Sequence, residues 1–86
     1  MPRKTDANQA EIVMALRQAG RTVQSLHKLG HGVPDLLVGY QGVNYLLEVK
    51  SRGCGLTGDE PEWHETWRGQ VSVVFTPEGA LKATGG

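Results

Sequence analysis

Two acidic residues and a lysine in this sequence have the types and spacing of a cation-assisted hydrolytic site. Asp35 follows Pro34 at the start of one β-rich segment, and Glu48 and Lys50 close the next such segment, thirteen positions later. Side chains two apart on a strand point to the same face, so Glu48 and Lys50 emerge together. An antiparallel pairing of the two segments brings Asp35 beside them. The sequence therefore predicts two carboxylates and an ammonium at one rim of a sheet.

Two converging carboxylates next to an apolar strand are costly unless a cation lies between them. Oxygen ligands of this kind suit Mg²⁺ and Mn²⁺, which also bind substrate phosphate. Such a cation favours attack by water on a phosphodiester, and Lys50 would orient that water or help to remove its proton. Each residue taken alone is more simply a solvated strand end or a turn residue. The combination of Asp35, Glu48 and Lys50, following the apolar run 45–47, favours phosphodiester hydrolysis.

The elements that must position these residues alternate between helix and strand. Helical spacing predicts a helix over 8–19 with Asp6 as its cap, and alternation predicts a strand over 22–26. The β-rich segments 35–40 and 44–50 flank Gln41-Gly42, which is typical of a tight antiparallel hairpin. Their continuous apolar runs favour a sheet covered on both faces by helices.

The second half of the chain predicts a further helix, strand and helix. Thr57 is expected to cap a helix that runs to about Arg68, with Glu60 three residues on as in a capping box. A strand over 71–76 and a short helix over 77–82, beginning with proline, follow. The predicted order is α-β-β-β-α-β-α, in the α/β class.

Length and composition bound the possibilities. With 86 residues, the sequence is expected to form one domain, residues 1–86. The hydrophobic fraction of 38% and the absence of a signal-like or membrane-length apolar run predict a cytoplasmic protein. Cys54 is the single cysteine and is interpreted as an incidental loop residue. The net charge of zero gives no electrostatic indication of nucleic-acid binding, so a partner protein supplying a DNA-binding surface is an open expectation.

The segment Pro34-Asp35 and, thirteen positions later, Glu48-Val49-Lys50-Ser51 resemble the PD-(D/E)XK nuclease superfamily. Further segments look like its compact, phage-type VRR-NUC branch, a group that includes Holliday junction resolvase-like proteins. These segments are Asn8–Ile12, Gly32–Gly39, Leu56-Thr57, Trp63-His64, Trp67–Gly69 and Val71. The resemblance extends over about residues 6 to 82.

This resemblance implies a restriction-endonuclease-like core, an α/β fold with a mixed four-stranded sheet flanked by helices. It implies that Asp35 and Glu48 are metal ligands, together with the backbone carbonyl of Val49. It also implies that Lys50 is the catalytic lysine and that Glu11, on the first helix, is a further acidic residue of the metal site. Mg²⁺ is the expected cofactor, and Mn²⁺ is expected to substitute for it.

Residue 60 departs from the family pattern, which tends to place a glutamine there, whereas this chain has Glu60 followed by Pro61. Glu60 is either a capping-box acid or a contact to metal or phosphate. Trp63 and Trp67 are four apart on one helix face, which favours a core or dimer contact over base stacking.

The remaining charged and aromatic residues give weaker indications. The three histidines have no partner at metal-site spacing, so none is placed in the site; they are His27, His31 and His64. Several basic residues are candidates for phosphate contacts, although each is more simply a solvated surface charge. They are Arg3, Lys4, Lys28, Arg52 and Arg68.

The first hypothesis is therefore a Mg²⁺-dependent DNA endonuclease, with branched DNA such as Holliday junctions as a candidate substrate. Acting on two strands would require two copies, so a homodimer is expected, in a bacterial or phage-infected cell. The alternative is a non-catalytic nucleic-acid-binding or assembly module that retains the nuclease fold. A third hypothesis is an interaction protein unrelated to nucleic acid. Divalent-metal binding and salt-sensitive DNA binding discriminate among the three.

Overall fold

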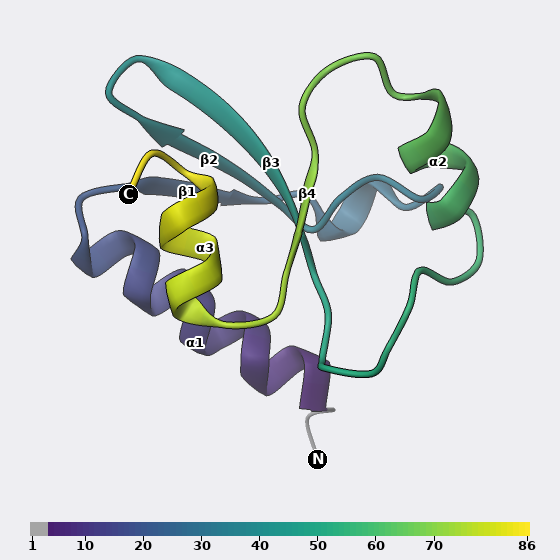
Figure 1. Cartoon of the computed structure of the whole chain (residues 1–86), viewed down its shortest axis with the longest axis horizontal. Helices are drawn as coiled ribbons and strands as arrows, with labels where there is room; N and C mark the ends of the chain where they lie inside the picture. The colour runs from purple at the N-terminus through teal and green to yellow at the C-terminus, as the bar shows by residue number, and fades with distance from the viewer. Residues whose placement is uncertain (1–3) are drawn as a thin grey trace.

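The computed structural model describes residues 4–86, which form a four-stranded mixed sheet and three α-helices (Figure 1). The elements in chain order are α1 (Lys4–Gln18), β1 (Thr22–Ser25), the short 3₁₀ helix η1 (His27–Leu29), β2 (Leu36–Tyr40), β3 (Val43–Val49), α2 (Glu60–Thr66), β4 (Ser72–Val74) and α3 (Pro77–Ala83). This order confirms the predicted α-β-β-β-α-β-α arrangement and adds η1. Within residues 4–86, no helix has both the length and the apolar character needed to cross a bilayer.

The four strands lie in the order β1-β2-β3-β4. β1 and β3 both pair with β2 in antiparallel fashion, whereas β3 and β4 are parallel. The predicted hairpin between β2 and β3 is confirmed, with Tyr40 opposite Val43. Gln41 and Gly42 both have left-handed backbone conformations, with φ of 51° and 79°. Two consecutive positive φ angles are what a type I′ turn requires, and this turn matches the twist of the flanking strands.

The hydrophobic core lies on one face of the sheet. Strand alternation and register put one set of buried side chains on this face. They are Leu36, Val38, Leu47, Val49 and Val74. Ile12 and Leu16 of α1 and Ala80 of α3 pack against this set. α1 and α3 also contact one another, and Figure 1 shows them side by side. These two helices therefore close the core together.

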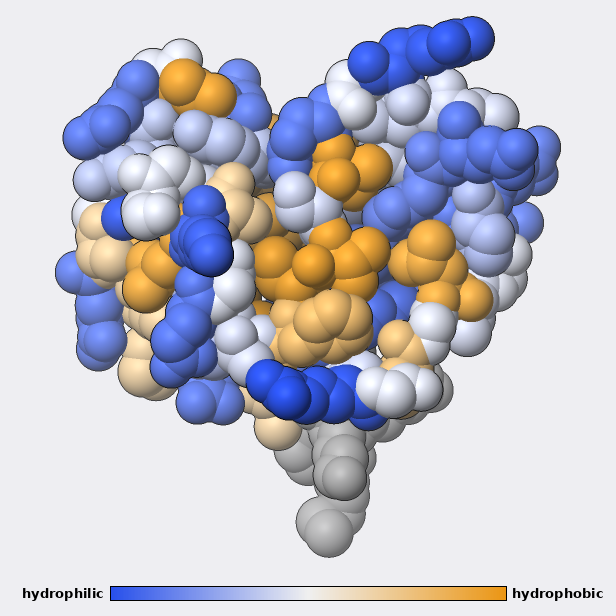
Figure 2. Space-filling view, viewed as in Figure 1, coloured by the Kyte–Doolittle hydropathy of each residue, from blue (hydrophilic) through white to orange (hydrophobic). Residues whose placement is uncertain are grey.

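The opposite face of the sheet is covered only in part, so the expectation of helices on both faces holds incompletely. α2 stands apart from α1 and α3 (Figure 1) and contains no buried residue. On this face Val73 of β4 remains 39% exposed. Figure 2 shows hydrophobic side chains gathered in the middle of the view, over β4, between two more hydrophilic sides. Glu48 lies on the same face as Val73, because the two are register partners.

Two predicted helix boundaries are wrong. α1 begins at Lys4, so Asp6 lies inside the helix and is not its cap; the predicted contact residue Arg3 lies outside the described residues. α2 begins at Glu60 and follows Asp59 rather than Thr57. Gly58 explains the later start, because its φ of 59° is incompatible with a right-handed helix running through it.

A buried arginine fastens the end of the described chain to the sheet. Arg21, which precedes β1, donates to the hydroxyl and the carbonyl of Thr84 at 3.2 and 3.3 Å. Its guanidinium also lies over the ring of Tyr40, 3.8 Å from the ring centroid. Hydrogen bonds and cation–π contact together compensate for burying the charge. Arg21 therefore joins α3 to β1 and β2.

Candidate active site

Asp35, Glu48 and Lys50 come together where β3 ends. Asp35 directly precedes β2, and the pairing of Leu36 with Leu47 brings it level with Glu48. Asp35 Oδ2 accepts a hydrogen bond of 2.8 Å from the backbone N–H of Val49. By strand alternation, Glu48 and Lys50 emerge on the face opposite the core. The structure thus brings together the three residues singled out by spacing alone.

The Glu48 carboxyl is buried, and one of its two oxygens lacks a hydrogen-bond partner among the described residues. Its side chain is 2% exposed, and its Oε1 has no hydrogen-bond partner within the described part of the chain. Burial raises the pKa of Glu48 to about 9, reinforced by hydrogen bonding to Asp35 and by the charges of Asp35 and Glu60, with Lys50 acting in the opposite direction. At neutral pH the carboxyl therefore holds its proton until additional positive charge arrives.

Lys50 forms an ion pair with Glu60 of α2. The Lys50 Nζ and Glu60 Oε1 atoms are 2.7 Å apart, and the two side chains are 12% and 22% exposed. Burial by itself lowers the pKa of Lys50, but the hydrogen bond to Glu60 and the nearby carboxylates outweigh it, so the pKa is raised. Lys50 is consequently held as an ammonium.

Glu60 takes the capping-box role, which is one of the two left open by the sequence, and also forms an ion pair with Lys50. Besides accepting from Lys50, its Oε1 accepts from the backbone N–H of Thr57 at 2.8 Å, which is half of a capping box. Burial opposes ionisation of Glu60, but these two hydrogen bonds outweigh it and lower its pKa. The carboxylate therefore anchors α2 to the end of β3.

His64 lies in the site, although sequence spacing did not place it there. Its Nε2 is 3.6 Å from Glu48 Oε1, and its side chain is 13% exposed. The signal that was available is the position of His64 four residues after Glu60, since residues four apart share a helix face. Once Glu60 faces Lys50, His64 on the same face is directed toward Glu48.

α1 reaches the site through Asn8 rather than through Glu11. The Asn8 side-chain amide donates to the carbonyls of Lys50 and Phe75, at 3.1 and 3.0 Å. Glu11 is exposed and lines a hollow with Ser51 of the following loop. Asn8 therefore holds together the ends of β3 and β4, and Glu11 borders the loop just beyond Lys50.

Val49 can take part only through its main chain. Its side chain is 1% exposed and lies in the core. Its N–H donates to Asp35, and the next N–H, that of Lys50, donates to Val74 of β4 at 3.0 Å. The backbone at the end of β3 is therefore held firmly on both sides.

The residues present fit a divalent cation. Within residues 4–86, no three His, Cys, Asp or Glu side chains converge as a ready-made metal-binding group. Asp35 and Glu48 nevertheless offer carboxylate oxygens, and Glu48 Oε1 is buried without a partner. An unpartnered buried oxygen is costly, and a hard cation relieves both that cost and the repulsion between the carboxyls.

The tryptophan pair lies on the surface. The rings of Trp63 and Trp67 are stacked, with centroids 4.6 Å apart and an interplanar angle of 18°. Trp67 is 44% exposed, so the core half of the predicted core or dimer contact is wrong, and the dimer half stays a prediction. The other two α-helices of residues 4–86, α1 and α3, pack against the core and not against this pair.

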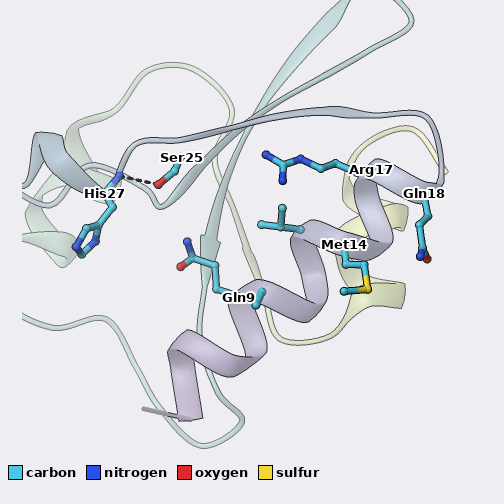
Figure 3. Close-up of a pocket in the computed structure, with 8 residues that line it drawn as sticks. Gln9, Met14, Arg17, Gln18, Ser25 and His27 are labelled. Carbon is cyan, nitrogen blue, oxygen red and sulfur yellow. Dashed lines mark hydrogen bonds between the residues drawn. The ribbon is translucent and has the colours of Figure 1, made fainter. Parts of the chain in front are cut away.

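Two of the three histidines and a separate groove stand outside the site. His27 and His31 are exposed. His27 and Ser25 border a groove beside α1, together with Met14 and Arg17 (Figure 3). The groove contains none of the carboxylates discussed above. The residues that line this groove belong mainly to α1.

Comparison with known proteins supports the fold. No family model and no curated protein matches the sequence. A solved structure described as a "VRR_NUC domain" is similar, with a TM-score of 0.76 and 26% sequence identity. The similarity covers 94% of each chain. The resemblance drawn from the sequence is thereby confirmed: the chain folds as a VRR-NUC nuclease-like domain.

Proposed function

We propose that the protein is a metal-dependent endonuclease that hydrolyses phosphodiester bonds of DNA. The observation that carries the proposal is the Glu48 carboxyl, buried beside Asp35 with an unpartnered oxygen, at the strand end that also bears Lys50. Buried ionisable groups with strongly perturbed pKa values are concentrated at functional sites. The similarity to a VRR-NUC domain points to DNA as the partner.

In this proposal Asp35 and Glu48 hold Mg²⁺ or Mn²⁺, with the Val49 carbonyl as a further ligand and Glu11 as an outer acidic residue. A bound divalent cation would supply Lewis-acid chemistry, stabilising negative charge on the phosphate and making water a better nucleophile. The hydrogen bond from Val49 fixes Asp35, so the carboxylate is oriented before the cation binds.

Lys50 acts as an ammonium rather than as a base. Its ion pair with Glu60 raises its pKa, so it donates hydrogen bonds to a phosphate oxygen or to the attacking water. Glu60 holds the ammonium in place through its second contact, to the Thr57 N–H.

We further propose branched DNA, such as a Holliday junction, as the substrate, and a homodimer as the acting species. One copy of 86 residues covers little DNA, and its net charge of zero provides little attraction for phosphates. The exposed Val73 on the edge strand β4 offers an apolar surface for a second copy. A partner protein with a basic surface would serve the same purpose.

The test is cleavage of labelled four-way junction, duplex and single-stranded DNA with Mg²⁺, Mn²⁺ or a chelator. Wild-type protein is compared with Glu48→Ala and with the control Glu65→Ala, which alters an exposed glutamate of α2. Cleavage that needs the cation and Glu48 but not Glu65 supports the proposal, and the substrate ranking tests junction preference. No cleavage by folded wild type with either cation refutes it.

A further inference from the structure

An exposed phenylalanine lies beside Lys50 on the sheet face that carries the candidate site. Phe75 directly follows β4, and the preceding carbonyl, that of Val74, accepts the Lys50 N–H at 3.0 Å. The Asn8 side-chain amide reaches the carbonyls of both Lys50 and Phe75, so these two residues are neighbours. Val74 points into the core, and strand alternation therefore directs Phe75 to the opposite face, where Glu48 and Lys50 emerge. Phe75 is 38% exposed, so its ring is available to a ligand.

The core does not need the ring of Phe75. This residue belongs neither to the buried cluster nor to the partly buried side chains that pack against that cluster. It borders two surface hollows, and Arg52, from the loop after β3, borders both of them as well. Among the described residues that line the hollow along β4, Arg52 is the one charged side chain, whereas the hollow toward α1 also contains Glu11. Figure 2 shows hydrophobic side chains gathered over β4. The hollow along β4 thus combines an aromatic ring, apolar valines and one guanidinium.

These groups fit a nucleotide whose base is turned toward the protein. Phosphates are bound by positive charge, which Arg52 supplies, whereas bases stack on aromatic rings such as that of Phe75. Bases inside a continuous duplex are stacked on one another and cannot reach the ring unless they are extruded. Extrusion costs least where the base is already single-stranded or mismatched. The hollow therefore suits DNA that has an unpaired base near the cleaved phosphate.

A second copy of the chain is the other occupant that an apolar surface can take, and the position of Phe75 argues against it at this end of β4. A protein interface that covered Phe75 would also cover Lys50, whose side chain is 12% exposed and must reach the substrate in the proposed reaction. Val73, two residues earlier, lies beside Glu48 instead. DNA is therefore the occupant that leaves Lys50 free to act.

We propose that Phe75 stacks on an unpaired base next to the cleaved phosphate and that Arg52 contacts the neighbouring phosphate. The inference rests on the proposed function, because it takes DNA as the partner and Lys50 as the group at the cleaved phosphate. It narrows the substrate to DNA with an unpaired base at that position, such as a single strand or an opened branch point.

Photochemical cross-linking tests the base contact on the wild-type protein. Single-stranded DNA and a four-way junction carry 5-iodouracil at successive positions and are irradiated with the protein in Mg²⁺ or in chelator. 5-Iodouracil cross-links to aromatic side chains that it contacts, and mass spectrometry identifies the linked residue. We expect a cross-link at Phe75 from the position next to the cleaved phosphate. A cross-link only at Trp63 or Trp67, or at no aromatic residue, overturns the inference.

Binding affinities separate stacking from charge. Phe75→Leu should weaken binding of the single strand and the junction by about five- to 150-fold and leave binding of continuous duplex unchanged, whereas Phe75→Tyr keeps the ring and the affinity. Arg52→Gln should instead lower the slope of log affinity against log salt by about 0.7, because one phosphate contact to a single strand is lost. The control Val43→Ala alters an exposed apolar residue at the far end of β3 and should change neither quantity. An equal loss for duplex and single strand in Phe75→Leu overturns the stacking.

Four outcomes separate this inference from the proposed function. Cation-dependent cleavage that requires Glu48, without a cross-link at Phe75, overturns the inference and leaves the proposed function standing. A cross-link at Phe75 without cleavage in Mg²⁺ or Mn²⁺ supports the base contact and refutes nuclease activity. Absence of DNA binding by folded wild type overturns both. Sedimentation in which Phe75→Leu dissociates a wild-type dimer assigns Phe75 to a subunit interface and overturns the base contact.

Discussion

The carboxylate of Asp35 accepts the backbone N–H of Val49 at 2.8 Å, so the residue that precedes β2 is fastened to the last residue of β3. The Asp35 side chain therefore has two separable properties. It accepts a hydrogen bond from β3, and it places a negative charge near Glu48. Substitutions that remove one property or both should have different effects.

Asp35→Asn keeps an acceptor for Val49 and removes the charge, whereas Asp35→Ala removes both. We expect the alanine variant to lose about 1–3 kcal/mol of stability, because the Val49 N–H is left unpaired. The asparagine variant should stay close to wild type in urea denaturation, since it keeps an acceptor for the Val49 N–H. Both variants should lose cleavage activity. Equal destabilisation by the two substitutions would show that the hydrogen bond to Val49 is unimportant.

Stability should depend on pH through Glu48. The pKa of this carboxyl is about 9 in the folded protein and 4.5 when unperturbed. Between these values the unfolded chain releases the proton that the folded protein keeps, so metal-free protein loses stability as pH rises from about 4.5 to 9. Thermal melting with a chelator at pH 5.5 and 8.5 measures the slope. If the slope is the same in Glu48→Gln, Glu48 is not the source of the pH dependence.

The ion pair between Lys50 and Glu60 should affect activity and stability in different ways. Glu60→Gln keeps an acceptor for Thr57 but removes the charge that raises the pKa of Lys50. The alkaline limit of cleavage should therefore move to lower pH. Glu60→Ala also loses the capping contact, at an additional cost of about 0.5–2 kcal/mol. pH–rate profiles and urea denaturation separate the two effects, and an unshifted alkaline limit would contradict the assignment of that limit to Lys50.

Substitutions in α1 should lower the stability of the protein by different amounts, depending on whether the residue is buried. Leu16 is completely buried, and Leu16→Ala should cost about 2–5 kcal/mol because it leaves a cavity. Met14 on the same helix is 60% exposed, and Met14→Ala should change stability by no more than about 0.5 kcal/mol. Urea denaturation of both variants tests the assignment of the buried face. Similar losses for the two would mean that α1 packs differently.

Much of the fold follows from local signals. The Gln41-Gly42 pair predicts a hairpin because both residues must adopt positive φ, and they do. That turn sets the register of β2 and β3, and the register brings Asp35 beside Glu48. The juxtaposition of the two carboxyls was thus predictable from residue spacing and turn chemistry.

The part of the site contributed by α2 was not predictable in the same way. The position of His64 depends on the path of the loop between Lys50 and Asp59 and on the close approach of Gly32 to α2. Both are contacts between segments distant in sequence, and neither is encoded by periodicity. The exposure of Trp67 was not predictable for the same reason, since four-residue spacing specifies the face that it shares with Trp63 but not what covers that face.

The contact between α1 and α3 also constrains when the protein can fold during synthesis. The apolar side of α1 is made early, but its partner begins only at Pro77. At translation rates of about 5–20 residues per second, α1 remains without α3 for several seconds on the ribosome, although β2 and β3, which also pack against Ile12 and Leu16, are made before then. The anchor formed by Arg21 with Thr84 closes later still. The core around α1 is therefore complete only after α3 has been synthesised.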